Sequence, residues 1–475
     1  MRVSRPFKSS GHCKPSPDGR YIATLSSSAV NVRSTETLAL VNVIKLSGDL
    51  QGPISTFIWS PSSRNILVAT ADDVQVSSAA DTSFNATIRN TTCPGGKPGL
   101  IYFGASDYEV LLCSPFGLKL AIVDLTTSKI VEISSPKFHH ASTASRGFSI
   151  RPATGHLAVL SRVGGKDMGI LWTPDGKWLL LWESPAQGHH LSIYTPDGQH
   201  FRTLGAATIL QDQQSGAEGE LEAGIKTCQL SPNAELCALG DHSAGVTILD
   251  TKTWRACLRL MHPITIIPKD TTQVWQEQSS EAKHTAPLHP GCSMAAFDAS
   301  STLLATKLDD SPCAVWIWDV AAAELRAVLI FHSAVGFSWH PSVRELLLVT
   351  CQDEARRGAT FVWDPLSDGP LLVSQADGLP NARPAKAVAK APKVLWVDRD
   401  TEFPELVVAE AERYALLSLC DADDGPGPWR DEGGVDGDGP FSARDDAEDT
   451  GRPVVLSPGD ISGLDDTFSF RNTSV

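Results

Sequence analysis

The chain lacks the long apolar runs and the positive charge that several classes of protein need. None of the uninterrupted apolar stretches in its 475 residues approaches the roughly 18 residues that span a bilayer. The opening MRVSRPFKSSGH contains no apolar run of the kind that a secretion signal requires. Lysine and arginine total 40 against 55 acidic residues, a net charge of −15, so the basic surface of a nucleic-acid or anionic-membrane binder is missing. We predict an intracellular protein whose partners are proteins, with no nucleic acid, no membrane and no small-molecule substrate.

Motifs for catalysis and metal binding are also missing. The ten cysteines occur singly from Cys13 to Cys420 without a Cys-x-x-Cys pair, which favours buried thiols over disulfides or a zinc site. There is no Gly-x-Ser-x-Gly elbow, no phosphate-binding glycine loop and no His-Glu-x-x-His helix. The adjacent histidine pairs, 139–140 and 189–190, have no cysteine or carboxylate at ligand spacing. We therefore predict no catalytic residue, no cofactor and no metal.

A recurring unit is the main feature that the sequence does contain. An apolar or aromatic strand leads into a turn that often contains proline, followed by a second apolar strand and a third that often ends in Asp. The turns begin near positions 17, 61, 105, 152, 174, 232, 298 and 341, so that most spacings lie in the mid forties. Short runs rich in Val, Ile, Thr and Trp are typical of strands rather than helices.

This period predicts an all-β fold, a WD-repeat β-propeller of seven or eight blades. The first and last blades are expected to meet, so that no sheet edge stays exposed. Large aromatic residues and strand-end aspartates are expected to hold the blades structurally rather than to catalyse a reaction. The repeat residues to which we assign this role are Trp59, Trp172, Asp250, Trp318, Asp319, Trp339, Trp363 and Asp364.

One repeat is too short. Only 22 residues separate the turns at 152 and 174, and residues 156–172 cannot supply four strands of about five residues each. One blade is therefore predicted to be incomplete. Either it is built from fewer strands, or the sequence lacks about half a repeat.

Two polar segments and the C-terminal region depart from the repeat. Residues 265–290 and 367–392 are predicted to be loops inserted into a propeller that covers residues 1–420. Residues 421–475 hold 14 acidic residues, four arginines, nine glycines and five prolines, a composition that predicts a disordered acidic tail. Ser457, which precedes Pro458, is a candidate site for a proline-directed kinase.

Several segments resemble the WD-repeat protein eight family, whose members are spindle-pole and centrosome proteins. They are the opening Phe7–Ala23, the block from Gly224 to Trp254, and Leu303–Leu329, with its Ala-Thr-Lys-x-Asp-Asp-x-Pro-x-Ala-Val-Trp-Ile-Trp-Asp sequence. The likeness extends over about residues 7–420 and is lost at the short repeat. It implies a non-enzymatic scaffold that joins a coiled-coil anchoring protein and a minus-end-directed kinesin to hold microtubule minus ends. It also implies a location in the cytoplasm and cytoskeleton, at the spindle pole or microtubule-organising centre.

Two other classes share these repeats, because a fold does not specify a function. One is a general adaptor in ubiquitin ligation, RNA processing or trafficking. The other is a propeller enzyme, which would need polar catalytic groups that the sequence does not visibly supply.

Overall fold

The computed structural model of the chain consists of β-strands joined by turns. Its described residues contain no helix, and so none that is long and apolar enough to cross a membrane. Two compact units are distinguished, unit 1 with residues 1–134 and 376–462 and unit 2 with residues 135–375 and 463–475. The described residues are 1–26, 28–48, 50, 52–92, 99–114, 119–134, 148–152, 154–159, 167–183, 190–205, 224–263, 272–277, 291–343, 345–352, 359–373, 392–399, 401, 403–420 and 429.

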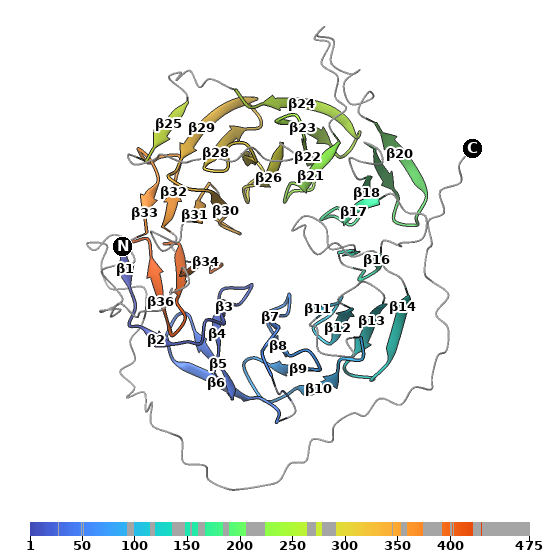
Figure 1. The fold of residues 1–475 in the computed structure, drawn as a ribbon, viewed down its shortest axis with the longest axis vertical. Coiled ribbons are helices and arrows are strands. Elements are labelled where there is room, and N and C mark those ends of the chain that lie inside the picture. Colours follow the sequence, from blue (N-terminus) through green and yellow to red (C-terminus); the bar gives the residue numbers. More distant parts are fainter. Residues whose placement is uncertain are drawn as a thin grey trace. The chain divides into compact units, whose positions relative to one another are not determined.

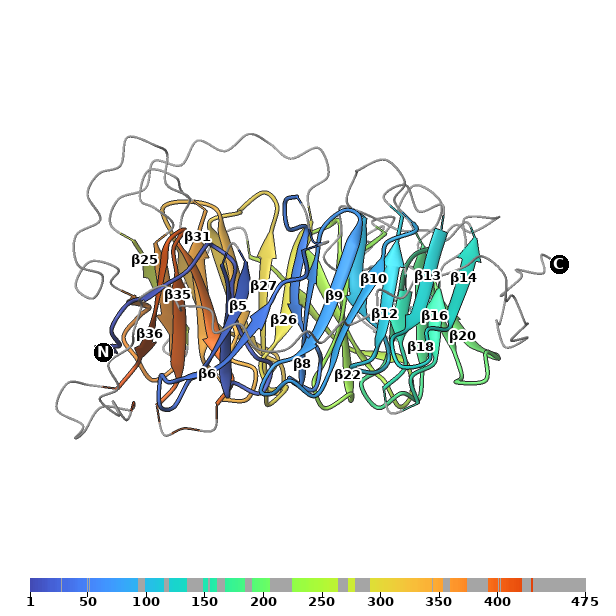
Figure 2. The ribbon, with the colours of Figure 1, turned by 90° about the horizontal axis from the view of Figure 1, so that it is seen from below.

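Unit 1 contains three four-stranded antiparallel sheets, each an up-and-down meander whose strands pair in chain order (Figure 1). Figure 2 shows three strands of the second of these sheets, β8, β9 and β10, from the side. The first sheet comprises β3 (Cys13–Pro15), β4 (Tyr21–Leu25), β5 (Ala29–Ser34) and β6 (Leu40–Lys45). The second comprises β7 (Thr56–Trp59), β8 (Asn65–Ala69), β9 (Asp73–Ser78) and β10 (Asn85–Arg89). The third comprises β11 (Leu100–Phe103), β12 (Glu109–Cys113), β13 (Lys119–Asp124) and β14 (Ile130–Ser134).

The remaining sheet of unit 1 combines the two ends of the propeller sequence. Its strands are β34 (Lys393–Val397), β35 (Glu405–Ala409), β36 (Arg413–Ser418), β1 (Arg2–Val3) and β2 (Phe7–Lys8). Both N-terminal strands pair antiparallel with β36, Arg2 opposite Ser418 and Phe7 opposite Tyr414. In Figure 1 the orange-red β36 accordingly lies beside the blue β1 and β2. This sheet also packs closely on the first one, because a Cβ at Gly19 (φ +67°) would lie 2.2 Å from the Asp398 carbonyl oxygen. The first and last blades therefore meet, as the sequence predicts.

Unit 2 contains four sheets in which four strands each pair antiparallel. They are β17 (Asp167–Trp172), β18 (Leu179–Glu183), β19 (Leu191–Tyr194) and β20 (His200–Leu204), then β21 (Ile225–Leu230), β22 (Leu236–Asp241), β23 (Gly245–Asp250) and β24 (Arg255–Met261). The next is β26 (Cys292–Phe297), β27 (Leu303–Leu308), β28 (Ala314–Asp319) and β29 (Glu324–Ile330), and the last is β30 (Val335–Trp339), β31 (Leu347–Cys351), β32 (Thr360–Trp363) and β33 (Leu371–Leu372). A fifth strand, β25 (Gln273–Gln276), adds in parallel to β29.

The short repeat forms a two-stranded sheet in unit 2, β15 (Phe148–Ile150) paired with β16 (Leu157–Val159). The next described strand, β17, already belongs to the following sheet. The described residues thus give eight sheets of four or five strands and one of two strands. The prediction of an all-β propeller is confirmed: the eight sheets of four or five strands are its full blades, and the two-stranded sheet is the predicted incomplete one.

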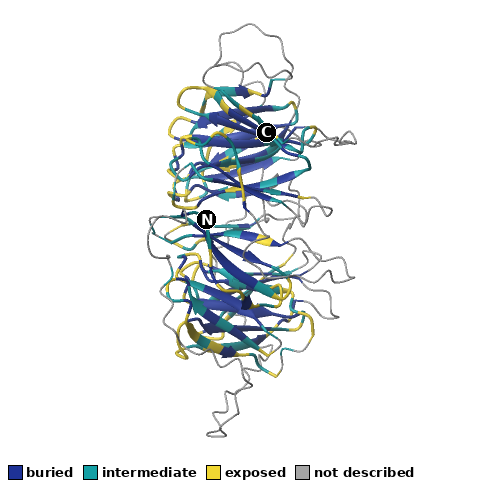
Figure 3. Ribbon diagram, turned by 90° about the vertical axis from the view of Figure 1, so that its left-hand side faces the viewer, coloured by how far each residue is buried: buried dark blue, intermediate teal, exposed yellow. Residues whose placement is uncertain are grey.

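Apolar second and third strands account for the core. Strands such as β8 and β35 are buried at all of their residues, since a strand in the middle of a blade is covered on both faces. Some fourth strands, such as β6, β20 and β33, are largely exposed, and we call the fourth strands outer strands. Figure 3 shows buried residues running along the strands and exposed ones lying mainly on the connections.

The segments outside the repeat are described only in part. Within the predicted loop 265–290, residues 272–277 are described and include β25, which makes this part a strand. Within 367–392, β33 belongs to a blade. Of the predicted acidic tail, Trp429 alone is described, and it packs half-buried against the core cluster of the first and last blades of unit 1. The rest of the tail, including Ser457, lies outside the described residues.

Candidate functional site

Two of the assigned tryptophans connect neighbouring sheets. Trp59 and Trp339 each end the first strand of a blade, just before a turn that contains proline, and both are buried. The indole N–H of Trp59 donates to the Lys14 carbonyl at 3.0 Å, and that of Trp339 donates to the Ala296 carbonyl at 2.8 Å. Each acceptor lies on the first strand of the preceding blade. These side chains are therefore occupied in holding blades together.

Trp172 has the same place in its blade but not the same bond. It is buried, and its indole N–H has no hydrogen-bond partner among the described residues. The preceding sheet is the two-stranded β15–β16, and the contacts across this junction come from other groups. The backbone N–H of Trp172 donates to Ser149 Oγ at 3.0 Å, and the Arg151 guanidinium lies over the indole ring. The incomplete blade thus coincides with the missing indole bond.

Trp318 belongs to a buried hydrogen-bond chain. Its indole N–H donates to Thr306 Oγ1 at 3.0 Å, and this hydroxyl lies 2.8 Å from His262 Nε2. His262 Nδ1 lies 2.6 Å from the Ala244 carbonyl, which can only accept, so Nδ1 carries the proton and Nε2 accepts from Thr306. Burial lowers the pKa of His262, against the effects of the Ala244 bond and of Asp310 and Asp241, which favours this neutral ring. This series of hydrogen bonds links His262, directly after β24 of one blade, to β27 and β28 of the next.

The three assigned aspartates cap turns. Asp250 accepts from the backbone N–H of Lys252 and from the Thr253 hydroxyl. Burial alone would raise the pKa of Asp250, but these hydrogen bonds and the Lys252 charge lower it. Asp319 and Asp364 likewise accept a backbone N–H two or three residues later, from Ala322 and Leu366 respectively. Carboxylates bound in this way stabilise the chain reversals after the third strands.

Trp363 brings the inserted strand β25 into the structure. It is fully buried, and its indole N–H donates to Gln273 Oε1 at 2.9 Å, while Gln273 Nε2 donates to the Ser367 carbonyl at 2.8 Å. Trp275, also on β25, packs against the aromatic rings of Phe331 and Phe361. A segment that the sequence predicts to be a loop is therefore fixed to two adjacent blades.

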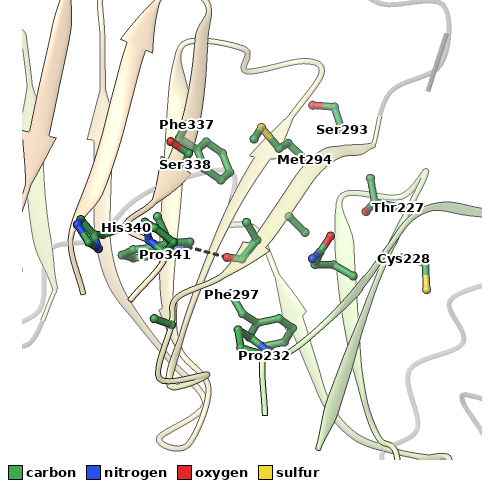
Figure 4. Close-up of a pocket in the computed structure, with 15 residues that line it drawn as sticks. Thr227, Cys228, Pro232, Ser293, Met294, Phe297, Phe337, Ser338, His340 and Pro341 are labelled. Atoms are coloured by element: carbon green, nitrogen blue, oxygen red, sulfur yellow. Dashed lines mark hydrogen bonds between the residues drawn. The ribbon is translucent and has the colours of Figure 1, made fainter. Parts of the chain in front are cut away.

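The first strands β21, β26 and β30 border a pocket of about 410 Å³ within unit 2 (Figure 4). Phe297, Phe337 and Met294 give it apolar walls, and the Trp339–Ala296 hydrogen bond crosses one side. None of the residues that line it is a lysine, arginine or carboxylate. Its imidazole, His340, accepts backbone N–H bonds from Ser342 and Val343 through Nδ1. The pocket suits an apolar side chain of a partner better than acid–base chemistry.

Apolar side chains are also exposed on two outer strands. On β6 in unit 1, Leu40, Val41 and Val43 are 42%, 40% and 45% exposed, and we call them the β6 patch. In unit 2, Leu371 and Leu372 on β33 are 56% and 51% exposed, and Leu366 in the preceding turn is 91% exposed. We call these three residues the β33 patch. Because apolar residues that gather on a rim expose area that water disfavours, such patches are typical of protein-binding surfaces.

Several of these residues could not be recognised in the sequence. His262, Thr306 and Gln273 are single polar residues whose partners lie 12 to 90 positions away. A histidine directly after a fourth strand is the only local signal for His262. Beside β25, Glu277, His332 and Cys351 form a group of three potential metal ligands, although their spacing in the sequence resembles no metal-binding motif.

Comparisons with known proteins identify relatives over most of the chain. An uncharacterised WD repeat-containing protein of Schizosaccharomyces pombe is 25% identical, covering 88% of this chain and 91% of its own length. The mouse WD repeat-containing protein WRAP73 is also 25% identical, over 77% of this chain and 87% of its own length. No protein-family profile matches. The β-propeller domain of Cps50 (Swd1) from Myceliophthora thermophila is similar at a TM-score of 0.40 and 15% identity, over 77% of this chain and 99% of that domain, which is too distant to guide a functional inference.

Proposed function

On the premise that this chain resembles WD-repeat proteins of the WRAP type, as these relatives confirm, we propose that it is a non-enzymatic scaffold of the spindle pole. In this role it joins a coiled-coil anchoring protein to a minus-end-directed kinesin, and so anchors the minus ends of spindle microtubules. The proposal places it in the cytoplasm and cytoskeleton, at the microtubule-organising centre. The observation that carries it is the likeness to WRAP73 over 77% of the chain.

The surface of the propeller supports a role in binding proteins. Four of the five assigned tryptophans donate internal hydrogen bonds through their indole N–H groups, and the three assigned aspartates cap turns. The exposed apolar residues, in contrast, gather on outer strands, where a partner can reach them without disturbing the core. A scaffold needs two separate surfaces to hold two partners at once. The β6 patch and the β33 patch belong to different units and provide them.

The proposal can be tested with two variants that remove one patch each. Val41→Thr with Val43→Thr alters the β6 patch, and Leu371→Thr with Leu372→Thr alters the β33 patch, while threonine keeps the preference for strand conformation. Each pair is expected to weaken binding of one partner, because truncating contact residues costs affinity where they form a hot spot. Met261→Thr, at a 53% exposed position on β24, is the matched control.

Two measurements separate this proposal from the alternatives. Affinity purification should recover spindle-pole coiled-coil proteins and a kinesin, and a tagged protein should concentrate at spindle poles in mitosis. Recovery of cullin adaptors or coat proteins would instead indicate a general adaptor. An even distribution through the mitotic cytoplasm, with normal spindles after deletion of the gene, would refute the spindle-pole role.

A further inference from the structure

Three side chains with metal-ligand atoms meet where the inserted strand β25 ends. Glu277 directly follows β25, His332 follows β29 after one residue, and Cys351 is the last residue of β31. One ligand atom from each lies within 4.8 Å of the other two. Among the described residues this is the only group of three such side chains. His332 lies 55 positions after Glu277, and Cys351 lies 19 positions after His332. The fold and not a local motif therefore brings them together.

The contacts around the group hold its members in place. The backbone N–H of Glu277 donates to the Ile330 carbonyl at 3.0 Å, and the backbone N–H of His332 donates to Glu277 Oε2 at 3.1 Å. Glu277 Oε2 also lies 2.5 Å from His332 Nδ1. The backbone N–H of Cys351 donates to the Ala359 carbonyl at 2.8 Å. All three side chains are thus carried on backbone that is already fixed, which lowers the ordering cost of binding an ion.

The burial of the group fits a metal centre with one accessible side. Cys351 is 1% exposed, the His332 side chain 5%, and the Glu277 side chain 18%. The thiol and the imidazole therefore lie in the protein interior, and the carboxylate is the most exposed of the three groups.

From this geometry we propose that Glu277, His332 and Cys351 bind one zinc ion. A thiolate, an imidazole nitrogen and a carboxylate oxygen are the ligands that Zn²⁺ takes in proteins, whereas Mg²⁺ and Ca²⁺ prefer oxygen alone. In a tetrahedral zinc site the ligand atoms lie roughly 3.3 to 3.8 Å apart. Side-chain rotations that move these atoms by about 1 Å therefore complete the coordination. Binding displaces the thiol proton of Cys351 and any proton on the imidazole nitrogen that binds. Water takes the fourth position.

The ion fastens the insertion to the propeller. Glu277 belongs to the segment that carries β25, while His332 and Cys351 belong to two successive blades. A zinc ion shared by the three therefore links β25 to both blades. Because an ion that binds only the folded state stabilises it by mass action, zinc is expected to raise the unfolding temperature of the full chain.

The test uses the full-length protein, freed of metal by dialysis and then titrated with ZnCl₂. We expect one zinc ion per chain by elemental analysis. With Co²⁺ as the probe, we expect a near-ultraviolet charge-transfer band that reports a cobalt–thiolate bond. Cys351→Ser is expected to abolish the band and to weaken zinc binding at least tenfold. Glu277→Gln, at the accessible edge of the site, should also weaken zinc binding and is less disruptive to the core.

Cys113→Ser is the matched control, because Cys113 is also buried and also ends the second strand of a blade. It should leave zinc binding and the cobalt band unchanged. If the wild-type protein gives no cobalt–thiolate band, or if Cys351→Ser and Glu277→Gln bind zinc as well as Cys113→Ser does, the site is refuted. Since the first of these outcomes requires no variant, a folding defect in Cys351→Ser would not rescue the proposal.

Discussion

At the scale of single residues, Glu405 in unit 1 couples folding to pH. It is 1% exposed at the start of β35, and the Arg399 guanidinium lies 3.2 Å from its Oε1. Burial raises the pKa of Glu405 to about 7, although Arg399 acts to lower it. In the unfolded chain the carboxyl titrates near 4.5. Between these two values the folded state therefore binds a proton that the unfolded state has released.

The sign of the effect follows from this difference. Stability falls with pH wherever the folded state binds more protons, so the contribution of Glu405 is fully present below pH 4.5 and is lost as pH rises through about 7. We expect the free energy of unfolding to fall by on the order of 3 kcal/mol across this range on account of this group. In Glu405→Gln that share of the pH dependence should disappear, as measured by denaturant titrations at pH 5 and pH 8.

Glu412→Gln provides the control, because Glu412 is exposed and lies in the turn just before β36 of the same sheet. Its pH profile should match that of the wild-type protein. A Glu405→Gln profile that also matched the wild type would mean that Glu405 is already ionised in the folded state.

Some of these residues could be predicted from sequence and others could not. Trp59, Trp339 and Asp364 stand in local patterns, a tryptophan before a proline turn or an aspartate at a strand end, and the pattern alone gives their location in a blade. His262 and Gln273 carry no such pattern. Their roles arise from partners 44 and 90 positions away, Thr306 and Trp363, and depend on how blades pack.

At the scale of elements, the indole bond between blades provides a matched comparison. Trp339 and Trp172 are buried to a similar extent at equivalent positions, but only Trp339 donates its indole N–H, to Ala296. Replacement by phenylalanine removes similar packing from both. In Trp339→Phe the replacement also removes a hydrogen bond, which typically contributes about 1 kcal/mol. It thereby leaves the Ala296 carbonyl with one bond fewer.

We therefore expect Trp339→Phe to destabilise unit 2 by about 1 to 2 kcal/mol more than Trp172→Phe does. Unfolding midpoints in urea, followed by tryptophan fluorescence and by circular dichroism, measure the difference. Equal losses would show that the Trp339–Ala296 bond adds nothing beyond packing.

The elements that sequence reasoning missed are those whose structure depends on a neighbour. The segment Gln-Val-Trp-Gln of β25 is too short and too polar to identify as a strand, and it becomes one by pairing with β29. The last sheet, β34 to β36, lacks a repeat turn of the kind found in the other blades, so the count of turns did not include it. The incomplete blade, in contrast, could be deduced from spacing, because 22 residues cannot hold four strands.

At the scale of the whole molecule, the described residue of the acidic C-terminal segment, Trp429, contacts the folded core. Trp429 packs against a cluster that includes Phe7, Ile22 and Tyr414, residues of the first and last blades of unit 1. Composition correctly marks this segment as poor in apolar residues, but it cannot show that a single tryptophan finds a site on the folded core.

A chain that ends at residue 420 is therefore expected to be less stable than one that ends at residue 432. Loss of a partly buried tryptophan costs about 1 to 3 kcal/mol in lost apolar burial. Trp429→Ala in the full chain should reproduce the loss, with thermal unfolding as the measurement. If the two truncated chains and the full-length Trp429→Ala protein all unfold at the temperature of the wild type, the contact of Trp429 contributes nothing to stability.

The pairing of β1 and β2 with β36 has a consequence for how the protein is made. Arg2 and Val3 are synthesised before their partners, Ser418 and Leu417, which are added more than 400 residues later. At about 5 to 20 residues per second, the N-terminal strands wait roughly 20 to 80 seconds for their neighbour. During that interval the nascent chain carries unpaired strand edges, which are open to association with other chains. Slow translation should therefore increase the demand for chaperones at this one junction more than at any blade built from consecutive residues.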